Sequence, residues 1–216
     1  MGVPVSTPTT NPSRCWPSPG RDLKWSSSHL QDPITAFHEL TTRVHLCIAE
    51  IQRFLELILA IINGTATGGG FSLALNCDFR TMTKTARLKQ ALTSHRLCLD
   101  VGGTCFLQRL VGLERALEIV ALNVWISEKQ ALNWELVNRV GPPEKLAAET
   151  PSWASRLAER SNHAFTTVKQ LPNESWNTQI KTQLEHERQG LVRTVKHFDG
   201  QEGLSAFLQK RSPRFA

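Results

Sequence analysis

Apolar residues recur every three or four positions between residues 34 and 54, which is the spacing of an amphipathic α-helix. The members of this row are Ile34, Phe37, Leu40, Val44, either Cys47 or Ile48, Ile51 and Phe54. Asp32 precedes Pro33, and an aspartate N-cap followed by proline at the first helical position is a typical helix start. We therefore expect a helix that begins at Pro33 and buries one face.

The next apolar segment is short and has no helical period. Residues 57–62 end at Asn63-Gly64, which predicts a buried strand followed by a turn. Residues 65–70 read TATGGG and predict a glycine-rich loop, after which a helix can start at Phe71. A second short strand is expected over residues 79–82.

Helical patterns dominate the rest of the chain. We expect Thr104 to cap a helix over residues 105–111, and Gly112 to separate it from a helix over residues 113–122. Ser127 and Gln130 have the spacing of a capping box. A strand over residues 136–140 is expected to stop at the two prolines 142 and 143. Helices then follow at about 144–160, 162–170, from Glu174 onward and 201–210, with the long helix placing Trp176, Ile180, Leu184, Leu191 and Val195 on one face.

Strands that alternate with helices, followed by a helical tail, indicate an α/β fold. Residues 1–31 are rich in Pro, Ser and Thr and lack any apolar period, so we expect a loosely attached or disordered lead-in. An α/β core is expected over residues 32–140, and a C-terminal helical region over residues 141–216.

Composition excludes several classes of protein. Hydrophobic residues make up 40% of the chain, which is enough for a packed core. The longest apolar run is far shorter than the ~20 residues of a membrane span, and no secretory leader is recognisable, so we expect no membrane partner. The five cysteines form no CxxC pair, which argues against a disulfide framework or a zinc site and for a reducing, cytoplasmic setting.

The net charge of +6 is concentrated in two clusters. Five basic residues and no acidic ones lie between Arg80 and Arg96, and seven basic against four acidic lie between Lys181 and Ala216. Such clusters suit a polyanion, either a nucleic acid or a phosphorylated small molecule. The charge pattern does not choose between these two.

The three glycines 68–70 are the first candidate for chemistry. A strand, a turn, three glycines and a helix start leave backbone N–H groups uncrowded, and these suit an oxygen that becomes negative during a reaction. The nucleotide motifs GxGxxG and GxxxxGK[ST] are absent. The alternative is that the glycines only allow close packing of the strand and helix.

Asp100 is the second candidate, because it is an acid in an apolar stretch beside two glycines. Loss of solvent there would raise its proton affinity and suit it to acid–base work; the alternative is a capping or turn aspartate. Asp78 faces the same choice, and there we favour the structural role. The seven histidines show no metal-binding spacing, so no metal is expected.

At these residues the chain resembles the enoyl-CoA hydratase/isomerase, or crotonase, family. Residues 61–78 (IINGTATGGGFSLALNCD) resemble its core signature, and the likeness continues through residues 100–104 (DVGGT), 107–112 (LQRLVG) and 136–140 (LVNRV). It covers roughly residues 14–216. The resemblance implies an α/β crotonase fold with a ββα superhelix core, here expected to be N-terminally truncated and to lack the first strands.

The resemblance also implies a binding site for an acyl-CoA thioester as substrate, with no permanently bound cofactor. Two backbone N–H groups of the family hold the thioester oxygen, and these fall on Gly69 and on Arg21 in the loop 18–23. Further substrate contacts are implied at Gly20, Asp22, Leu23, Gly68 and Gly70. The aromatic and the lysine that the family offers to CoA, often across a trimer interface, fall on Phe207 and Lys210, so a homotrimer or hexamer is implied.

The carboxylates implied by the resemblance favour one reaction. The two glutamates with which the hydratases flank a water correspond to Ser72 and Leu92, whereas Asp100 matches the acid of dienoyl-CoA and ring-opening isomerases. One carboxylate can move a proton between two carbons without activating water, so we favour double-bond isomerisation over hydration.

Departures from the family pattern leave other functions open. Arg21, Arg96 and Glu135 stand where glycines are expected, and residues 55–57 replace a Pro-x-Pro. A charged residue is a severe change wherever the backbone needs a positive φ, so an impaired or inactive member that binds acyl-CoA or assembles with paralogues is the alternative. RNA binding through the basic cluster 80–96 is a third possibility, to which we give the least weight.

Overall fold

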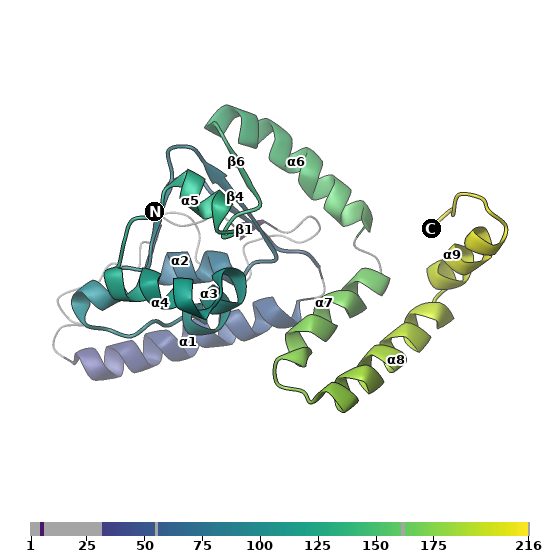
Figure 1. The fold of residues 1–216 in the computed structure, drawn as a ribbon, viewed down its shortest axis with the longest axis horizontal. Helices are drawn as coiled ribbons and strands as arrows, with labels where there is room; N and C mark the ends of the chain where they lie inside the picture. The colour runs from purple at the N-terminus through teal and green to yellow at the C-terminus, as the bar shows by residue number, and fades with distance from the viewer. Residues whose placement is uncertain (1–4, 7–31, 55, 161–162, 216) are drawn as a thin grey trace. The chain divides into compact units, whose positions relative to one another are not determined.

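The computed structural model describes residues 5–6, 32–54, 56–160 and 163–215. The chain divides into two compact units, Met1–Ser155 and Arg156–Ala216. Figure 1 shows that the first unit combines strands with helices and that the second is helical. The predicted lead-in over residues 1–31 lies outside the described residues, apart from the short strand β1 (Val5–Ser6).

Helix α1 (Pro33–Arg53) begins where the sequence predicts. The Thr35 N–H donates to Asp32 Oδ1 at 3.1 Å, so the aspartate satisfies one of the free amides at the helix start. Ile48 is buried, and it packs with Val44 and Ile51 against Leu73 and Val101 from other elements. The apolar row of this helix therefore faces the core of the first unit.

The main sheet has the order β1-β2-β4-β6. Strands β2 (Leu59–Ile62) and β4 (Phe79–Thr83) are parallel, with Leu59 opposite Phe79, and β6 (Arg139–Gly141) is parallel to β4. Most residues of β2 and β4 are buried, as expected for parallel strands covered on both faces. The prediction of a strand over residues 136–140 was wrong in its position, because Leu136 and Val137 lie in the core before β6 begins.

A second, two-stranded sheet joins β3 (Thr65–Thr67) to β5 (Arg87–Lys89) in parallel. The prediction of a loop over residues 65–70 was therefore wrong for its first half. Only Ala66 of β3 is buried, so the strand depends on pairing with a segment about twenty residues further along the chain. Helix α2 (Gly69–Leu75) then begins two residues earlier than predicted.

Helices complete the first unit. These are α3 (Gly103–Val111), α4 (Leu113–Leu122) and α5 (Glu128–Asn133), with a 3-10 turn, η3 (Leu92–His95), before α3. Helix α6 (Pro143–Arg160) belongs to the first unit up to Ser155. The capping box at Ser127 and Gln130 is confirmed. The prediction that Thr104 caps α3 was wrong, because Gly102 occupies the N-cap position with a left-handed backbone. The largest fully buried side chains include Phe71, Ile62, Met82, Leu88, Leu107, Ile119, Ile126 and Leu136.

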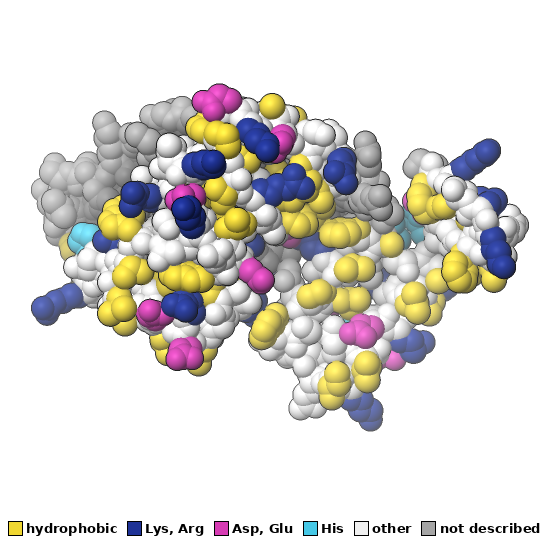
Figure 2. All heavy atoms as spheres, turned by 45° about the horizontal axis from the view of Figure 1, so that its top comes forward, with side chains coloured by type: hydrophobic (Ala, Val, Ile, Leu, Met, Phe, Trp, Pro, Cys, Tyr) yellow, Lys and Arg dark blue, Asp and Glu magenta, His cyan; other side chains and the backbone are white. Residues whose placement is uncertain are grey.

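The C-terminal unit contains α7 (His163–Ser175), α8 (Ile180–Lys196) and α9 (Phe198–Leu208). A helix starting at Glu174 was predicted, but Glu174 belongs to the end of α7 and the next helix starts at Ile180. Apolar side chains stand at the surface of this unit in Figure 2. The residues of the predicted apolar row are all exposed: Trp176, Ile180, Leu184, Leu191 and Val195.

Candidate active site

Asp100 lies in the loop between η3 and α3, and its carboxyl is turned inward. Its Oδ1 is buried and has no hydrogen-bond partner among the described residues. Burial raises the pKa of Asp100 from its ordinary value of 3.8. Asp78 differs, because its Oδ2 accepts the Ile58 N–H at 2.7 Å. Asp78 thus has the structural role predicted for it, while Asp100 retains an oxygen available for a proton.

Val101, directly after the acid, has a left-handed backbone with φ of 53°. This conformation is unusual for a β-branched residue, and three contacts hold it. The Val101 carbonyl accepts from Asn76 Nδ2 at 2.8 Å, and its N–H donates to His45 Nε2 at 3.4 Å. Its side chain packs with Ile48 and Leu73. The peptide that follows Asp100 is therefore fixed from several sides.

Gly69 is the first residue of α2, where backbone N–H groups have no acceptor within the helix. A methyl group on Gly69 would lie 3.6 Å from Cγ2 of Val101. The structure thus brings Gly69 and the loop that carries Asp100 together. These are the two segments that the sequence singled out for chemistry.

The flanking glycines differ from one another. Gly68 has φ of 54°, and its N–H donates to the Lys89 carbonyl at 3.1 Å, so this amide is already used in joining α2 to β5. A methyl group on Gly70 would meet nothing within 4 Å. Gly70 therefore has open space around it, as a position beside a bound ligand would.

The remaining predicted site residues are not brought to this place by the described structure. Gly20, Arg21, Asp22 and Leu23 lie outside the described residues. Phe207 in α9 is 78% exposed, and Lys210 is exposed just after the helix. Both belong to the C-terminal unit, and their contribution to a site stays a prediction.

Ser72 and Leu92 occupy the two positions at which the resemblance places a glutamate in the hydratases. Ser72 is buried in α2, and a methyl group on Gly103 would lie only 2.5 Å from its Oγ. Leu92 begins η3 and is partly buried. No ionisable side chain stands at either position.

His45 is the residue of this region that sequence reasoning missed. The histidines were discounted because their spacing suits no metal, yet α1 places His45 against the Val101 N–H and within electrostatic reach of Asp100. The available signal was its place directly after Val44, beside the buried face of the helix. Nothing in the local sequence says which loop that face meets.

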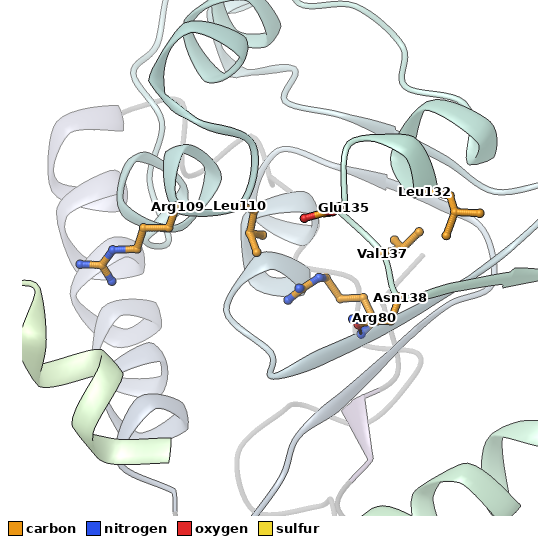
Figure 3. A pocket seen from close by; sticks show the side chains of 7 residues that line it. All are labelled: Arg80, Arg109, Leu110, Leu132, Glu135, Val137 and Asn138. Carbon is orange, nitrogen blue, oxygen red and sulfur yellow. Dashed lines mark hydrogen bonds between the residues drawn. The ribbon is translucent and has the colours of Figure 1, made fainter. Parts of the chain in front are cut away.

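A cavity of about 450 Å³ lies elsewhere in the first unit. Figure 3 shows the side chains that line it, which are Arg80, Arg109, Leu110, Leu132, Glu135, Val137 and Asn138. None of the predicted site residues is among them. The cavity is therefore distinct from the region around Asp100.

Arg80 takes part in the structure at this cavity rather than in binding a polyanion. Its side chain is buried, and its guanidinium donates to the carbonyls of Leu136 at 2.7 Å and Cys77 at 2.5 Å. Burial lowers the pKa of Arg80. Lys89, another member of the basic cluster 80–96, lies over the Trp125 ring. The cluster is thus less available to nucleic acid than its sequence suggests.

Two of the expected glycine positions have the conformation that favours glycine. Arg96 has φ of 58° and Glu135 has φ of 59°, so both side chains are carried on left-handed backbone. Residues other than glycine adopt this region at a cost. At both positions, therefore, a charged residue stands on backbone with a positive φ, which is the severe change expected from the sequence.

The described part of the chain contains neither a candidate membrane span nor a candidate metal cluster. No helix there is long and apolar enough to cross a membrane. No group of three or more His, Cys, Asp or Glu residues there is placed to hold a metal ion.

Comparison with known proteins gives one consistent result. A family model described as enoyl-CoA hydratase/isomerase matches residues 20–216. The 1,2-epoxyphenylacetyl-CoA isomerase of Escherichia coli is 34% identical over 168 residues, and the crotonyl-CoA hydratase of Syntrophomonas wolfei is 33% identical over 165. These alignments cover 78% and 76% of this chain and 64% of each relative. The chain thus spans less than two thirds of these relatives.

Solved structures agree in fold. An enoyl-CoA hydratase from Polaromonas superposes with a TM-score of 0.76 and is 30% identical, and the match covers 88% of this chain and 74% of that one.

A 4-chlorobenzoyl coenzyme A dehalogenase of Arthrobacter is 31% identical over 77% of this chain and 60% of its own length. By their names, the similar proteins include an isomerase, a hydratase and a dehalogenase.

Proposed function

Because this chain belongs to the enoyl-CoA hydratase/isomerase family and has its crotonase fold, we propose that it acts on acyl-CoA thioesters and shifts a carbon–carbon double bond. The single observation that carries this proposal is the inward-turned Asp100 carboxyl, whose Oδ1 is buried without a partner in a loop that touches Gly69. A proton-transfer group and a set of unused backbone N–H groups are the two parts such a reaction needs.

The proposed reaction uses one carboxylate twice. Asp100 takes a proton from C2 of a 3-enoyl thioester, and the thioester oxygen becomes an enolate oxyanion. The Gly69 N–H stabilises this oxygen, together with the N–H of Arg21 from the loop 18–23. Asp100 then returns the proton to C4, so the double bond moves from C3–C4 to C2–C3 and no co-reactant is consumed.

Isomerisation is favoured over hydration by the residues around the acid. Hydration needs one group to deprotonate water and another to protonate the alkene carbon. Ser72 is buried against α3 and Leu92 has no ionisable group, so Asp100 would be the one carboxylate for both tasks. A raised pKa suits a carboxyl that must both accept and return a proton.

CoA binding is proposed to involve the C-terminal unit. Phe207 is exposed and Lys210 carries a positive charge, so an adenine ring and a phosphate are suitable partners for them. In a homotrimer or hexamer these residues would serve the site of a neighbouring subunit. The glycines 68 and 70 and residues 20, 22 and 23 would line the thioester end.

The test is turnover of a 3-enoyl-CoA by the purified chain, followed by the absorbance of the conjugated 2-enoyl product. We expect Asp100→Asn to reduce turnover at least about a thousandfold, because the amide cannot accept the proton. Binding of CoA should be retained, as measured by thermal shift. Asp78→Asn is the control for loss of a carboxylate outside the site. Unchanged turnover in Asp100→Asn would remove this residue from the mechanism.

A second candidate function is favoured by Arg96 and Glu135, whose left-handed backbone stands where the family expects glycine. An impaired member would bind acyl-CoA or assemble with paralogues without turnover. A thermal-shift titration with a panel of acyl-CoAs separates the cases, since a bound ligand raises the melting temperature whether or not it reacts. Stabilisation without conjugation would identify the binding-only protein.

A further inference from the structure

His45 is a histidine for which the proposed double-bond shift gives no role. It lies on α1, one residue after Val44 on the helix face that meets Leu73 and Val101. The imidazole itself is exposed at the edge of this contact. Its Nε2 accepts the Val101 N–H at 3.4 Å, which requires a neutral ring with its proton on Nδ1.

The contact falls on the most constrained peptide of the site. Val101 is β-branched and has φ of 53°, and such strain persists only where the surroundings over-determine the conformation. Asn76 fixes the carbonyl side of Val101, and Ile48 and Leu73 fix its side chain. His45 supplies the contact on the N–H side, where the peptide joins Val101 to Asp100.

The orientation of that peptide decides where the acid points. The Asp100 carbonyl of this peptide accepts the Gly103 N–H at 2.8 Å, and a rotation of the peptide would move the adjoining Asp100 carboxyl from its present position. An acceptor on the N–H opposes this rotation. A bond of 3.4 Å is long, but catalytic contacts in ligand-free proteins often shorten when substrate binds.

We propose that His45 is a positioning residue for Asp100, which holds the Val101 N–H and thereby keeps the acid directed at the substrate. This inference rests on the proposed function. In this role His45 takes no proton from the substrate and does not contact the substrate. What it requires is a neutral hydrogen-bond acceptor at this place on α1.

The experiment compares His45→Leu, which removes the acceptor, with His45→Gln, whose side-chain oxygen can accept the same N–H. His38→Leu is the matched control, because it replaces another exposed histidine of α1. Two quantities are measured in each variant: kcat and KM with a 3-enoyl-CoA, and the hydrogen-exchange rate of the Val101 amide by NMR.

We expect His45→Leu to lower kcat roughly ten- to a hundredfold with KM within about twofold, since small displacements of a catalytic group cost rates of this order. Exchange at Val101 should become faster in the same variant. His45→Gln should restore both quantities to within about threefold of wild type, and His38→Leu should change neither. Wild-type kcat in His45→Leu, or equal losses in the Leu and Gln variants, would overturn the proposal.

The exchange measurement separates this proposal from the proposed function. If wild type itself fails to convert any 3-enoyl-CoA, the proposed function fails, and the Val101 amide still reports on His45. Faster exchange in His45→Leu than in His45→Gln would then support the positioning contact. Equal exchange in wild type and His45→Leu would refute it.

Discussion

At the scale of single residues, the proposed site depends on the Asp100 carboxyl, which the fold partly removes from solvent. Asp100 has a raised pKa because burial disfavours its charged form. The same burial that adapts the acid to proton transfer also makes its charged form unfavourable for folding. If Asp100 acts as proposed, we expect activity and stability to depend on pH in opposite directions at this residue.

We expect Asp100→Asn to be more stable than wild type near neutral pH, by up to about 1 kcal/mol, since the group is only partly buried. The folded protein binds the Asp100 proton more tightly than the unfolded chain, so stability falls as pH rises from the ordinary aspartate value of 3.8 through the raised one. Urea unfolding of both proteins between pH 3 and 7 measures this difference. It should vanish at the acid end; a difference that does not change with pH would contradict the assignment.

Turnover should show the opposite dependence, because in the proposed reaction the carboxylate form of Asp100 takes the first proton. We expect kcat/KM to fall as pH is lowered through the raised pKa, which lies above the usual aspartate range. The pH profile of conjugation measures the midpoint. A midpoint at or below the ordinary value would mean that another group limits the rate.

Glu135 offers a second residue-scale prediction, because it has φ of 59°. We expect Glu135→Gly to stabilise the protein by about 0.5–1 kcal/mol. Glycine removes the cost of the left-handed backbone, and this gain is partly cancelled because glycine raises the conformational entropy of the unfolded chain. Glu135→Ala is the control, since it removes the carboxylate but keeps the Cβ atom. Thermal unfolding should show a gain for Gly alone; equal gains would attribute the effect to charge.

At the scale of elements, α2 and α3 approach each other through Gly103 and Ser72. A Cβ atom on residue 103 would lie 2.5 Å from Ser72 Oγ and 3.4 Å from Ser72 Cβ. Ser72 is itself buried within α2, so its hydroxyl has little room to turn away. The contact between these helices therefore sets the position of the loop that carries Asp100.

We expect Gly103→Ala to destabilise the protein by about 1–3 kcal/mol, because the added methyl overpacks a buried contact. The double variant Gly103→Ala with Ser72→Ala should recover most of the loss, since the remaining Ser72 Cβ distance is tolerable. Chemical denaturation of the two single variants and the double variant measures the coupling. If the stability losses of Gly103→Ala and Ser72→Ala simply add in the double variant, the close approach of residue 103 to Ser72 is not the cause of the destabilisation.

At the scale of the whole molecule, the C-terminal unit leaves an apolar row without a partner among the residues described. Ile180, Leu184, Leu191 and Val195 of α8 are exposed, and at about 100° per residue they lie within roughly 60° of arc. A row of this kind indicates a protein–protein surface. It accords with the homotrimer or hexamer proposed above.

We expect the protein to sediment at three or six times its chain mass of 24.2 kDa. Leu191→Lys should shift it toward smaller species, because a charge would have to be buried in the apolar contact. Thr182→Lys adds the same charge on the opposite side of α8 and should leave the mass unchanged. Sedimentation velocity at several concentrations makes the comparison; a monomeric wild type would refute the assembly.

The sequence determined the features that depend on neighbouring residues. Asp32-Pro33 and the apolar row behind them specified α1, and the Ser127–Gln130 capping box specified α5. The order of strands and helices was sufficient to predict the α/β class. These are local effects of capping and periodicity, which a chain carries before it folds.

The tertiary structure decided what depends on distant partners. Thr65–Thr67 became a strand because Arg87–Lys89 pairs with it, and the row on α8 became a surface rather than a core. Above all, the fold placed the loop that carries Asp100 beside Gly69. It also brought His45 to the N–H of Val101, in the peptide that follows Asp100. Burial, electrostatic proximity and strain arise only when segments far apart in sequence meet, so no local pattern could specify them.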